Sequence, residues 1–231
     1  MIAKKIKKVV AKNIYKLFNL RNPLYSIEDG SSPLPEIVII FLTYRCNLKC
    51  SYCNVSVNYE QNGRKELLLE EWETLFKKLS LFKPFILITG GEPLLHPDLP
   101  EILQAIKKNE MNCELLTNAT IVQADWIKRI VDIGLDKLRF SIDGTADIHE
   151  KYRGNSGSYK MTEKFIDYLM DYKKTISSSF PKLYMNYLIT EQNSGVLKET
   201  IDYWMSKGVD GITLLNVFLK PKNLIDSHNT Q

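Results

Sequence analysis

The chain contains the segment Thr43-Tyr44-Arg45-Cys46-Asn47-Leu48-Lys49-Cys50-Ser51-Tyr52-Cys53-Asn54, which holds three of its four cysteines. They are spaced C-x3-C-x2-C and follow an apolar, β-branched run, residues 37–42, which predicts a buried strand. Three thiolates on the loop leaving a strand can converge on one metal centre, and thiolates select zinc, copper(I) or iron–sulfur clusters. Structural zinc takes four protein ligands, and no fourth is evident nearby, so one metal position is left open.

Cys46, Cys50 and Cys53, with the aromatic Tyr52 directly before the last of them, resemble the cluster loop of the radical S-adenosylmethionine (radical SAM) enzymes. The resemblance implies that the cysteines hold three irons of a [4Fe–4S] cluster, while SAM chelates the fourth through its amino and carboxylate groups. In that family the reduced cluster splits SAM into methionine and a 5′-deoxyadenosyl radical, and the protein supplies binding, orientation and exclusion. The alternative is a zinc knuckle completed by a distant fourth ligand.

Length and cysteine usage limit the class of protein. A chain of 231 residues suits one α/β barrel-like domain better than two small domains. Four cysteines in such a chain do not make a disulfide framework, and their clustering favours metal binding in a reducing compartment, which we expect to be the cytoplasm. No run approaches the ~18 apolar residues of a membrane span.

The positive charge of the chain is concentrated at its N-terminus. Residues 1–22 hold seven of the 31 Lys and Arg residues and no acid, and in the remainder acids outnumber bases, so we expect no nucleic-acid partner. At ~100° per residue the lysines fall on one side of a helix and apolar residues on the other. This pattern is typical either of a helix docked peripherally on a membrane or partner, or of one packed on its own domain.

The rest of the chain divides by composition. Residues 23–36 are rich in proline, glycine and serine and predict a linker. Residues 37–219 alternate apolar strands with helical patterns, and residues 220–231 form a tail. The predicted strands are residues 37–42, 85–89, 113–117, 137–142, 183–190 and 211–217, and the predicted helices are 67–81, 99–108, 124–133, 159–173 and 196–207. Such alternation predicts an α/β fold with a parallel sheet. The family resemblance implies a partial (β/α)6 TIM-type barrel, whose chemistry lies at the carboxyl ends of its strands.

The loop after the second strand reads Thr89-Gly90-Gly91-Glu92-Pro93. Two glycines let a backbone approach a ligand closely, and the proline fixes the exit of the loop. The loop resembles the GGEP motif of the radical SAM family, which implies that Gly90, Gly91 and Glu92 bind the SAM amino group through backbone carbonyls and an acid. Without the resemblance, it is a tight strand-to-helix turn.

The fourth strand ends in Ser141-Ile142-Asp143-Gly144, followed by His149 and Arg153. This segment resembles the S-[IL]-D-G…H-[DE]-x-x-R pattern of the branch that includes sulfatase-maturing and peptide-modifying enzymes. The resemblance implies that Ser141 binds SAM near its ribose and that Arg153 contacts the SAM carboxylate, since a carboxylate needs a cation. The alternative makes Asp143-Gly144 a turn and Arg153 a surface residue. We expect His149 to be structural.

The sequence also predicts roles for residues on the third and fifth strands. Thr117-Asn118 either faces the active site, as in related enzymes, or caps the turn that follows. Asn186 on the fifth strand is expected to point towards the ribose or methionine part of SAM, opposite to Met185 and Tyr187. Cys113 is expected to be a buried structural thiol.

The resemblance covers about residues 37–217. No cysteine follows Cys113, so auxiliary clusters of the kind that many relatives carry in a C-terminal domain are not expected. The molybdenum-cofactor cyclase branch carries basic residues near the first, second and fifth strands. The corresponding predicted strands here, residues 37–42, 85–89 and 183–190, contain no Arg or Lys, which argues against a cyclase. The sequence is therefore either a minimal radical SAM enzyme or a piece of a longer one.

The sequence thus predicts an iron–sulfur enzyme that cleaves SAM reductively and abstracts hydrogen from a substrate that no residue pattern identifies. No catalytic residue is assigned beyond the cluster ligands. Family chemistry implies an electron donor such as ferredoxin or flavodoxin. Two alternatives are a non-catalytic metal- or SAM-binding module that docks through its basic helix, and a relative that binds SAM without radical turnover.

Overall fold

A computed structural model describes residues 34–53, 55 and 65–216 of the chain. The chain divides into two units, Met1–Glu36 and Ile37–Gln231, and every helix and strand discussed below belongs to the second. The predicted basic helix at 1–22, most of the linker at 23–36 and the tail at 220–231 lie outside the described residues. Within the described part, no helix is both long enough and apolar enough to cross a membrane.

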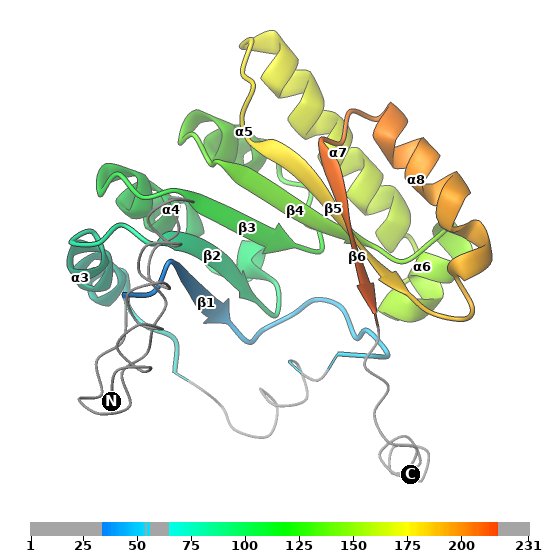
Figure 1. Ribbon diagram of the computed structural model, residues 1–231, viewed down its shortest axis with the longest axis horizontal. Coiled ribbons are helices and arrows are strands. Elements are labelled where there is room, and N and C mark those ends of the chain that lie inside the picture. The colour runs from blue at the N-terminus through cyan, green and yellow to red at the C-terminus, as the bar shows by residue number, and fades with distance from the viewer. Residues whose placement is uncertain (1–33, 54, 56–64, 217–231) are drawn as a thin grey trace, which may run out of the picture. The chain divides into compact units, whose positions relative to one another are not determined.

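Six strands form one sheet whose spatial order follows the sequence (Figure 1). All five neighbouring pairs are parallel. The strands are β1 (Ile37–Thr43), β2 (Phe85–Gly90), β3 (Cys113–Thr117), β4 (Lys137–Ile142), β5 (Lys182–Ile189) and β6 (Gly211–Asn216). The predicted α/β fold with a parallel sheet is confirmed.

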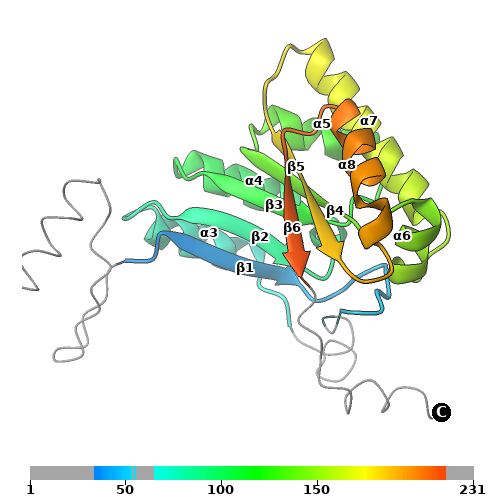
Figure 2. The same ribbon diagram turned by 45° about the vertical axis from the view of Figure 1, so that its right-hand side comes forward.

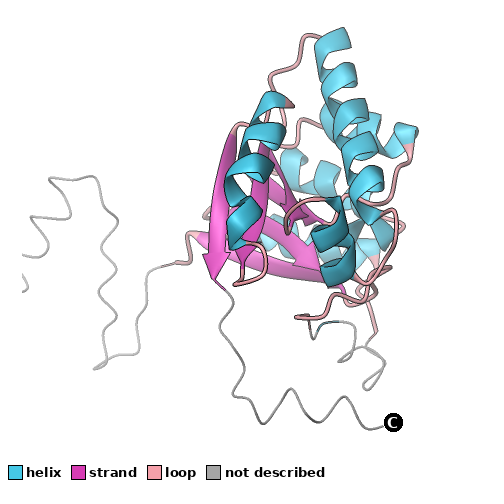
Figure 3. Cartoon of the chain, turned by 90° about the vertical axis from the view of Figure 1, so that its right-hand side faces the viewer, coloured by secondary structure: helices cyan, strands magenta, loops and turns pink. Residues whose placement is uncertain are grey.

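Helices connect successive strands, as parallel pairing requires. They are α3 (Leu69–Leu79), α4 (Leu99–Lys108), α5 (Ala124–Asp132), α6 (Ala146–Arg153), α7 (Ser158–Thr175) and α8 (Leu197–Ser206), with short 3₁₀ turns at Pro93–Leu95 and Ser194–Val196. Seen along the sheet, the helices lie on one of its faces (Figure 3). Sequence patterns predicted all of these helices except α6.

The hydrophobic core lies between the sheet and the helices. Alternate strand residues, such as Ile86 and Ile88 on β2, point to this side and are fully buried. Phe140 of β4 packs on Trp204 of α8 with 4.9 Å between ring centroids, and both side chains are fully buried. Burying a side chain of this size contributes about 1.5–3 kcal/mol, so this layer stabilises the packing of the helices on the sheet.

The opposite face of the sheet is more open and more polar. Phe41 of β1 is 49% exposed there. On β4 the same face carries Arg139, which ion-pairs with Glu114 of β3 and donates to Thr213 of β6 at 2.6 Å. In a barrel this face becomes the interior.

Parallel strands bring all their carboxyl ends to one edge of the sheet. The loop after β1 carries the three cysteines, and this cysteine loop (residues 44–53) runs along that edge towards α6 (Figure 2). The loops after β2, β3 and β4 begin at the same edge. The fold therefore gathers the predicted motifs in one region.

Candidate functional site

The three cysteines are free thiols that are neither fully buried nor fully exposed. Each sulfur has an N–H group nearby: the Leu48 amide lies 3.4 Å from Cys46 Sγ, the Val55 amide 3.5 Å from Cys53 Sγ, and Arg153 Nη1 3.9 Å from Cys50 Sγ. Such donors stabilise anionic sulfur. A partly accessible set of three thiols with N–H donors suits a thiolate-bound iron–sulfur cluster. Within the described residues, no three His, Cys, Asp or Glu side chains gather closely enough to hold one ion.

Burial affects the protonation of two of these thiols, Cys46 and Cys50. It raises the pKa of Cys46 and of Cys50 above the ordinary value, and the charges of neighbouring groups raise both further, while the guanidinium of Arg153 opposes the shift at Cys50. A bound metal needs thiolates, and its positive charge lowers the pKa of each ligand. Cys46 and Cys50 therefore favour the neutral thiol without metal and should release their protons when metal binds.

Gly90 and Gly91 admit the cysteine loop itself. A Cβ on Gly90 would lie 2.2 Å from the carbonyl oxygen of Thr43, and one on Gly91 would lie 2.2 Å from that of Arg45. The backbones are also hydrogen-bonded, from Gly91 N–H to Thr43 O at 2.7 Å and from Glu92 N–H to Arg45 O at 2.8 Å. The sequence indicated close approach to a ligand, whereas this structure supplies a partner within the chain.

Glu92 is fully buried and joins the loops after β2 and β3. Its Oε1 accepts from the Leu94 amide at 3.0 Å and from Thr117 Oγ1 at 2.7 Å, and its Oε2 accepts from the Asn118 amide at 2.7 Å. Burial raises the pKa of Glu92 to about 7, although these three donors each act to lower it.

Asn118 continues this connection to the cysteines. Its Nδ2 donates to Asn47 Oδ1 at 2.9 Å and lies 4.0 Å from Cys46 Sγ. The pair Thr117-Asn118 therefore faces the site and also stabilises the turn, because Thr117 Oγ1 accepts from the Ala119 amide at 2.9 Å. Both sequence interpretations of this pair are compatible with its contacts.

Arg153 lies beside Cys50 and is 7% exposed. Its Nε donates to Asp143 Oδ2 at 2.6 Å, and its guanidinium lies 5.7 Å from the centre of the Tyr52 ring. The Tyr52 hydroxyl donates to Asp143 Oδ2 at 3.0 Å. The predicted site residues Tyr52 and Arg153 are therefore brought together through a carboxylate that the sequence interpretation assigned only to a turn. Their roles towards SAM stay predictions.

Ser141 and Asn186 are register partners on β4 and β5, on the face turned away from the helices. Asn186 Oδ1 accepts a hydrogen bond from Arg139 Nη1 at 3.2 Å, which orients its amide. With the oxygen turned to Arg139, the Nδ2 hydrogens are available for an acceptor. The predicted SAM contacts of both residues stay predictions.

His149 and Cys113 occupy structural positions. The Asp143 amide donates to Nδ1 of His149 at 3.3 Å, and burial lowers the pKa of this imidazole to about 3, so it is neutral. Cys113 is fully buried in the core, where burial raises its pKa to about 12. Both side chains lie where the sequence analysis expects a structural residue.

Sequence reasoning missed two charged residues that hold the cysteine loop. Glu66 accepts two hydrogen bonds from Arg45, at 2.9 Å each, and one from the Thr43 hydroxyl. Asp143 lies inside the motif Ser141-Ile142-Asp143-Gly144, so the sequence did offer a signal that it belongs to the site. Nothing in the sequence around Glu66 marks it, because its partners precede it by about twenty residues.

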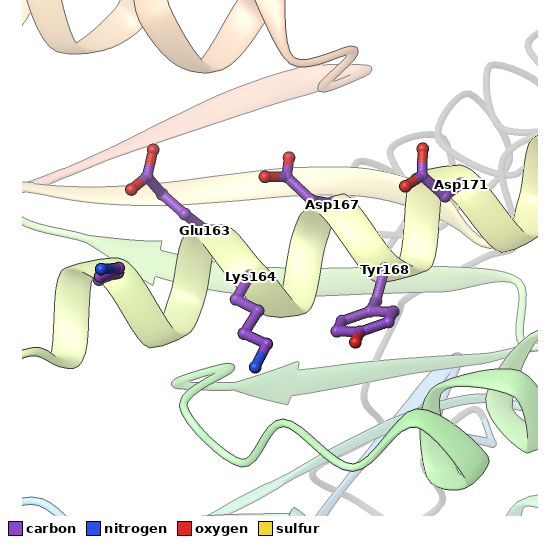
Figure 4. Close-up of a pocket in the computed structure, with 6 residues that line it drawn as sticks. Glu163, Lys164, Asp167, Tyr168 and Asp171 are labelled. Carbon is purple, nitrogen blue, oxygen red and sulfur yellow. The ribbon is translucent and has the colours of Figure 1, made fainter.

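A surface depression elsewhere is lined by one face of α7 (Figure 4): Lys160, Glu163, Lys164, Asp167, Tyr168 and Asp171. Two of its carboxylates pair with Lys207, at 3.9 Å from Glu163 and 2.9 Å from Asp167. These contacts are those of a solvated helix face, and none of the residues is among the predicted site residues.

Comparison with known proteins adds independent evidence. Residues 40–203 match the family described as the Radical SAM superfamily. Pre-heme d1 synthase of Dinoroseobacter shibae is 32% identical over 179 residues, which cover 76% of this chain and 42% of that protein. A probable GTP 3′,8-cyclase of Methanococcus maripaludis is 30% identical over 162 residues, which cover 70% of this chain and 52% of that protein. The chain thus spans about half or less of the length of these relatives.

Solved structures show the same fold. SuiB of Streptococcus suis bound to its precursor peptide SuiA superposes with a TM-score of 0.68 at 18% identity, covering 92% of this chain and 43% of that one. The structure titled anSMEcpe with bound AdoMet gives a TM-score of 0.65 at 20% identity, covering 81% of this chain and 54% of that one. The predicted partial barrel of the TIM type is confirmed by these matches.

Proposed function

We propose that this chain, which belongs to the radical SAM superfamily, holds a [4Fe–4S] cluster through Cys46, Cys50 and Cys53 and cleaves SAM reductively. The chemistry that these cofactors supply when bound is the splitting of SAM into methionine and a 5′-deoxyadenosyl radical, which abstracts hydrogen from a substrate. The observation that carries the proposal is the arrangement of the three free thiols on one loop at the carboxyl edge of the sheet, each with an N–H donor.

The predicted SAM contacts come from the loops and strands beside the cysteines. We assign the backbone carbonyls of Gly90 and Gly91, with Glu92, to the cationic amino group, because carbonyl and carboxylate oxygens attract it. Ser141 and Asn186 are register partners on adjacent strands and offer a hydroxyl and an amide, which are groups that can hydrogen-bond to a ribose. Their register pairing and the shared edge support this assignment.

Arg153 is assigned to the SAM carboxylate and Tyr52 to the same neighbourhood. The guanidinium has five N–H donors, and Asp143 accepts from its Nε, so donors remain for a second anion. In this arrangement the chain's own part is to bind and orient SAM.

Cleavage of SAM does not by itself identify the substrate or the partners of this chain. The relatives carry names as different as pre-heme d1 synthase, probable GTP 3′,8-cyclase and the subtilosin biosynthesis protein AlbA of Bacillus subtilis. The proposal therefore leaves the substrate open. It includes a cytoplasmic electron donor such as ferredoxin or flavodoxin, since reductive cleavage needs electrons.

The basic segment at residues 1–22 is proposed to dock the enzyme peripherally on an anionic membrane or on a partner. Each lysine near an anionic surface contributes ~1 kcal/mol, and salt screens the attraction. Deleting residues 1–22 should abolish salt-sensitive sedimentation with anionic vesicles while keeping the melting temperature. A large fall in melting temperature, with no vesicle binding by the intact chain, would instead favour packing on the domain.

The proposed activity is tested on anaerobically purified protein. We expect about four irons and four sulfides per chain, visible absorption that bleaches with dithionite, and slow release of 5′-deoxyadenosine on adding SAM and reductant. Cys50→Ala should abolish that release, whereas Cys113→Ala should retain it in the fraction that folds. Stoichiometric zinc without labile sulfide would refute the enzyme and favour a metal-binding module. A cluster that binds SAM without cleaving it would identify a relative lacking turnover.

A further inference from the structure

The C-terminal turn of α6, residues 152–154, lies against residues 49–51 of the cysteine loop. The amide of Ser51 donates to the carbonyl of Tyr152 at 2.9 Å, and Arg153 Nη1 lies 3.9 Å from Cys50 Sγ. The two segments thus run antiparallel, with Ser51 opposite Tyr152 and Cys50 opposite Arg153. Cys50 is the central residue of the part of the loop that contacts α6.

Gly154 makes the third contact of this pairing. It adopts the left-handed conformation, with φ of 62°, and ends α6. A Cβ at this position would lie 2.9 Å from the carbonyl oxygen of Lys49, closer than a real Cβ comes to backbone. The absence of a side chain is therefore required twice, by the backbone conformation and by the loop that lies against it.

Arg153 introduces a buried positive charge into the contact. Its partner Asp143 also accepts from the Tyr52 hydroxyl, and Tyr52 follows Cys50 by two residues. The guanidinium, its carboxylate and the ring of Tyr52 thus surround one side of the Cys50 sulfur. A cationic N–H donor beside a sulfur ligand favours the more negative, reduced form of an iron–sulfur cluster and so raises its reduction potential.

We propose that the α6 turn (Tyr152–Gly154) is the positioning element for Cys50, with Gly154 admitting the cysteine loop and Arg153 raising the reduction potential of the cluster through the Cys50 sulfur. This inference rests on the proposed function, because it assumes that Cys50 is a cluster ligand. It assigns α6, which contributes none of the cysteines, to the tuning of the metal centre.

The steric part is tested with two alanine variants. Gly154→Ala and Gly157→Ala both place a Cβ on a left-handed residue, with φ of 62° and 86°, but a Cβ on Gly157 meets only the end of the Met161 side chain, at 4.0 Å. We expect Gly154→Ala to hold the cluster about 10-fold or more weakly, a loss typical when a partner of a metal ligand is disturbed. The measurement is iron retained per chain against a chelator, with circular dichroism confirming that both variants are folded.

Equal iron retention by the two variants would overturn the steric part. If Gly154→Ala does not fold, Gly154→Asn is measured in its place, because asparagine keeps the Cβ contact with the Lys49 carbonyl but tolerates the left-handed backbone conformation better than alanine. The same outcomes apply to it.

The electrostatic part is tested by a redox titration of the cluster. Arg153→Gln should shift the midpoint potential to more negative values. The double variant Asp143→Asn/Arg153→Gln leaves no buried carboxylate unpaired and removes one charge of each sign, so it should shift the potential in the same direction by a smaller amount, through the lost N–H donor to the Cys50 sulfur. The control Arg129→Gln removes a guanidinium from an exposed ion pair with Glu101, and its potential should equal that of the wild type. An unchanged potential in both Arg153 variants would overturn this part.

The two proposals fail in different ways. A wild-type chain that binds no iron–sulfur cluster refutes the proposed function and, with it, this inference. A wild-type chain with a normal cluster, whose iron retention and potential are indifferent to residues 153 and 154, refutes only this inference.

Discussion

Replacing Gly91 by alanine should displace the cysteine loop. The new Cβ would lie 2.2 Å from the Arg45 carbonyl oxygen, 2.7 Å from its carbon and 2.8 Å from the Tyr44 oxygen, whereas ordinary contact begins at 3.4 Å. All three atoms are backbone, so rotation of a side chain cannot relieve an overlap of about 1 Å. The loop after β2 and the cysteine loop must move apart.

The cost follows from the strain and from the bonds that this movement breaks. Overpacking costs typically about 1–3 kcal/mol. The hydrogen bonds to Thr43 O, at 2.7 Å, and Arg45 O, at 2.8 Å, contribute about 1 kcal/mol each. A total of roughly 3–5 kcal/mol is a large part of the ~5–15 kcal/mol that stabilises a typical domain.

Urea unfolding and iron content measure this effect. We expect a lower unfolding midpoint for Gly91→Ala and a smaller amount of iron per folded chain after anaerobic reconstitution. The control is Gly195→Ala, because a Cβ there meets nothing within 4 Å and neither glycine has a positive φ. An unfolding midpoint and an iron content equal to those of the control would refute the argument that Gly90 and Gly91 lack side chains in order to admit the cysteine loop.

Two further predictions concern Glu92 and the core. Burial raises the pKa of Glu92 from 4.5 to about 7, so between these values the folded metal-free chain binds a proton that the unfolded chain has released, and stability falls as pH rises. The loss of stability approaches roughly 3 kcal/mol by pH 8. In urea titrations between pH 4 and pH 8, Glu92→Gln should remove this pH dependence of the unfolding free energy. Parallel curves for the variant and the wild type would contradict the raised pKa of Glu92. Phe140→Ala, which removes a buried ring 4.9 Å from Trp204, should cost about 3–5 kcal/mol without changing iron per folded chain; a loss below 1 kcal/mol, or depleted iron, would show that the ring has another role.

The sheet could be predicted from the sequence because each strand is a short segment in which apolar residues are continuous or alternate with other residues, as in Lys137–Ile142. The helix α6 could not, because its only buried side chains are His149 and Arg153, which are polar and give no apolar stripe. Its ends were the available signal: Thr145 stands at the N-cap, and Gly154 ends the helix in a left-handed conformation. Polar burial in a helix depends on tertiary partners, which a hydrophobic period does not report.

Motif resemblance selected residues that the fold brings together, but their contacts required coordinates. The loop of Gly90 to Glu92 was expected to face SAM, and in the structure it contacts Thr43, Arg45, Thr117 and Asn118 of the same chain. Such pairings join residues far apart in sequence, so composition and spacing carry no signal for them. Arg139, which orients Asn186, was missed for the same reason.

The cysteine loop is fixed on several sides before any cofactor binds. Glu66 holds Arg45, Asn118 holds Asn47, and the α6 turn holds Ser51, so anchors occur before, between and after the first two cysteines. A ligand loop that is already ordered loses little conformational entropy when it binds metal, and the binding free energy is correspondingly greater. The same anchors restrict the positions of the thiols relative to β2, β3 and β4. Because the predicted SAM contacts lie on those elements, a change that shifts the loop should alter cluster and SAM binding together, whereas Ser141→Ala should alter SAM binding alone.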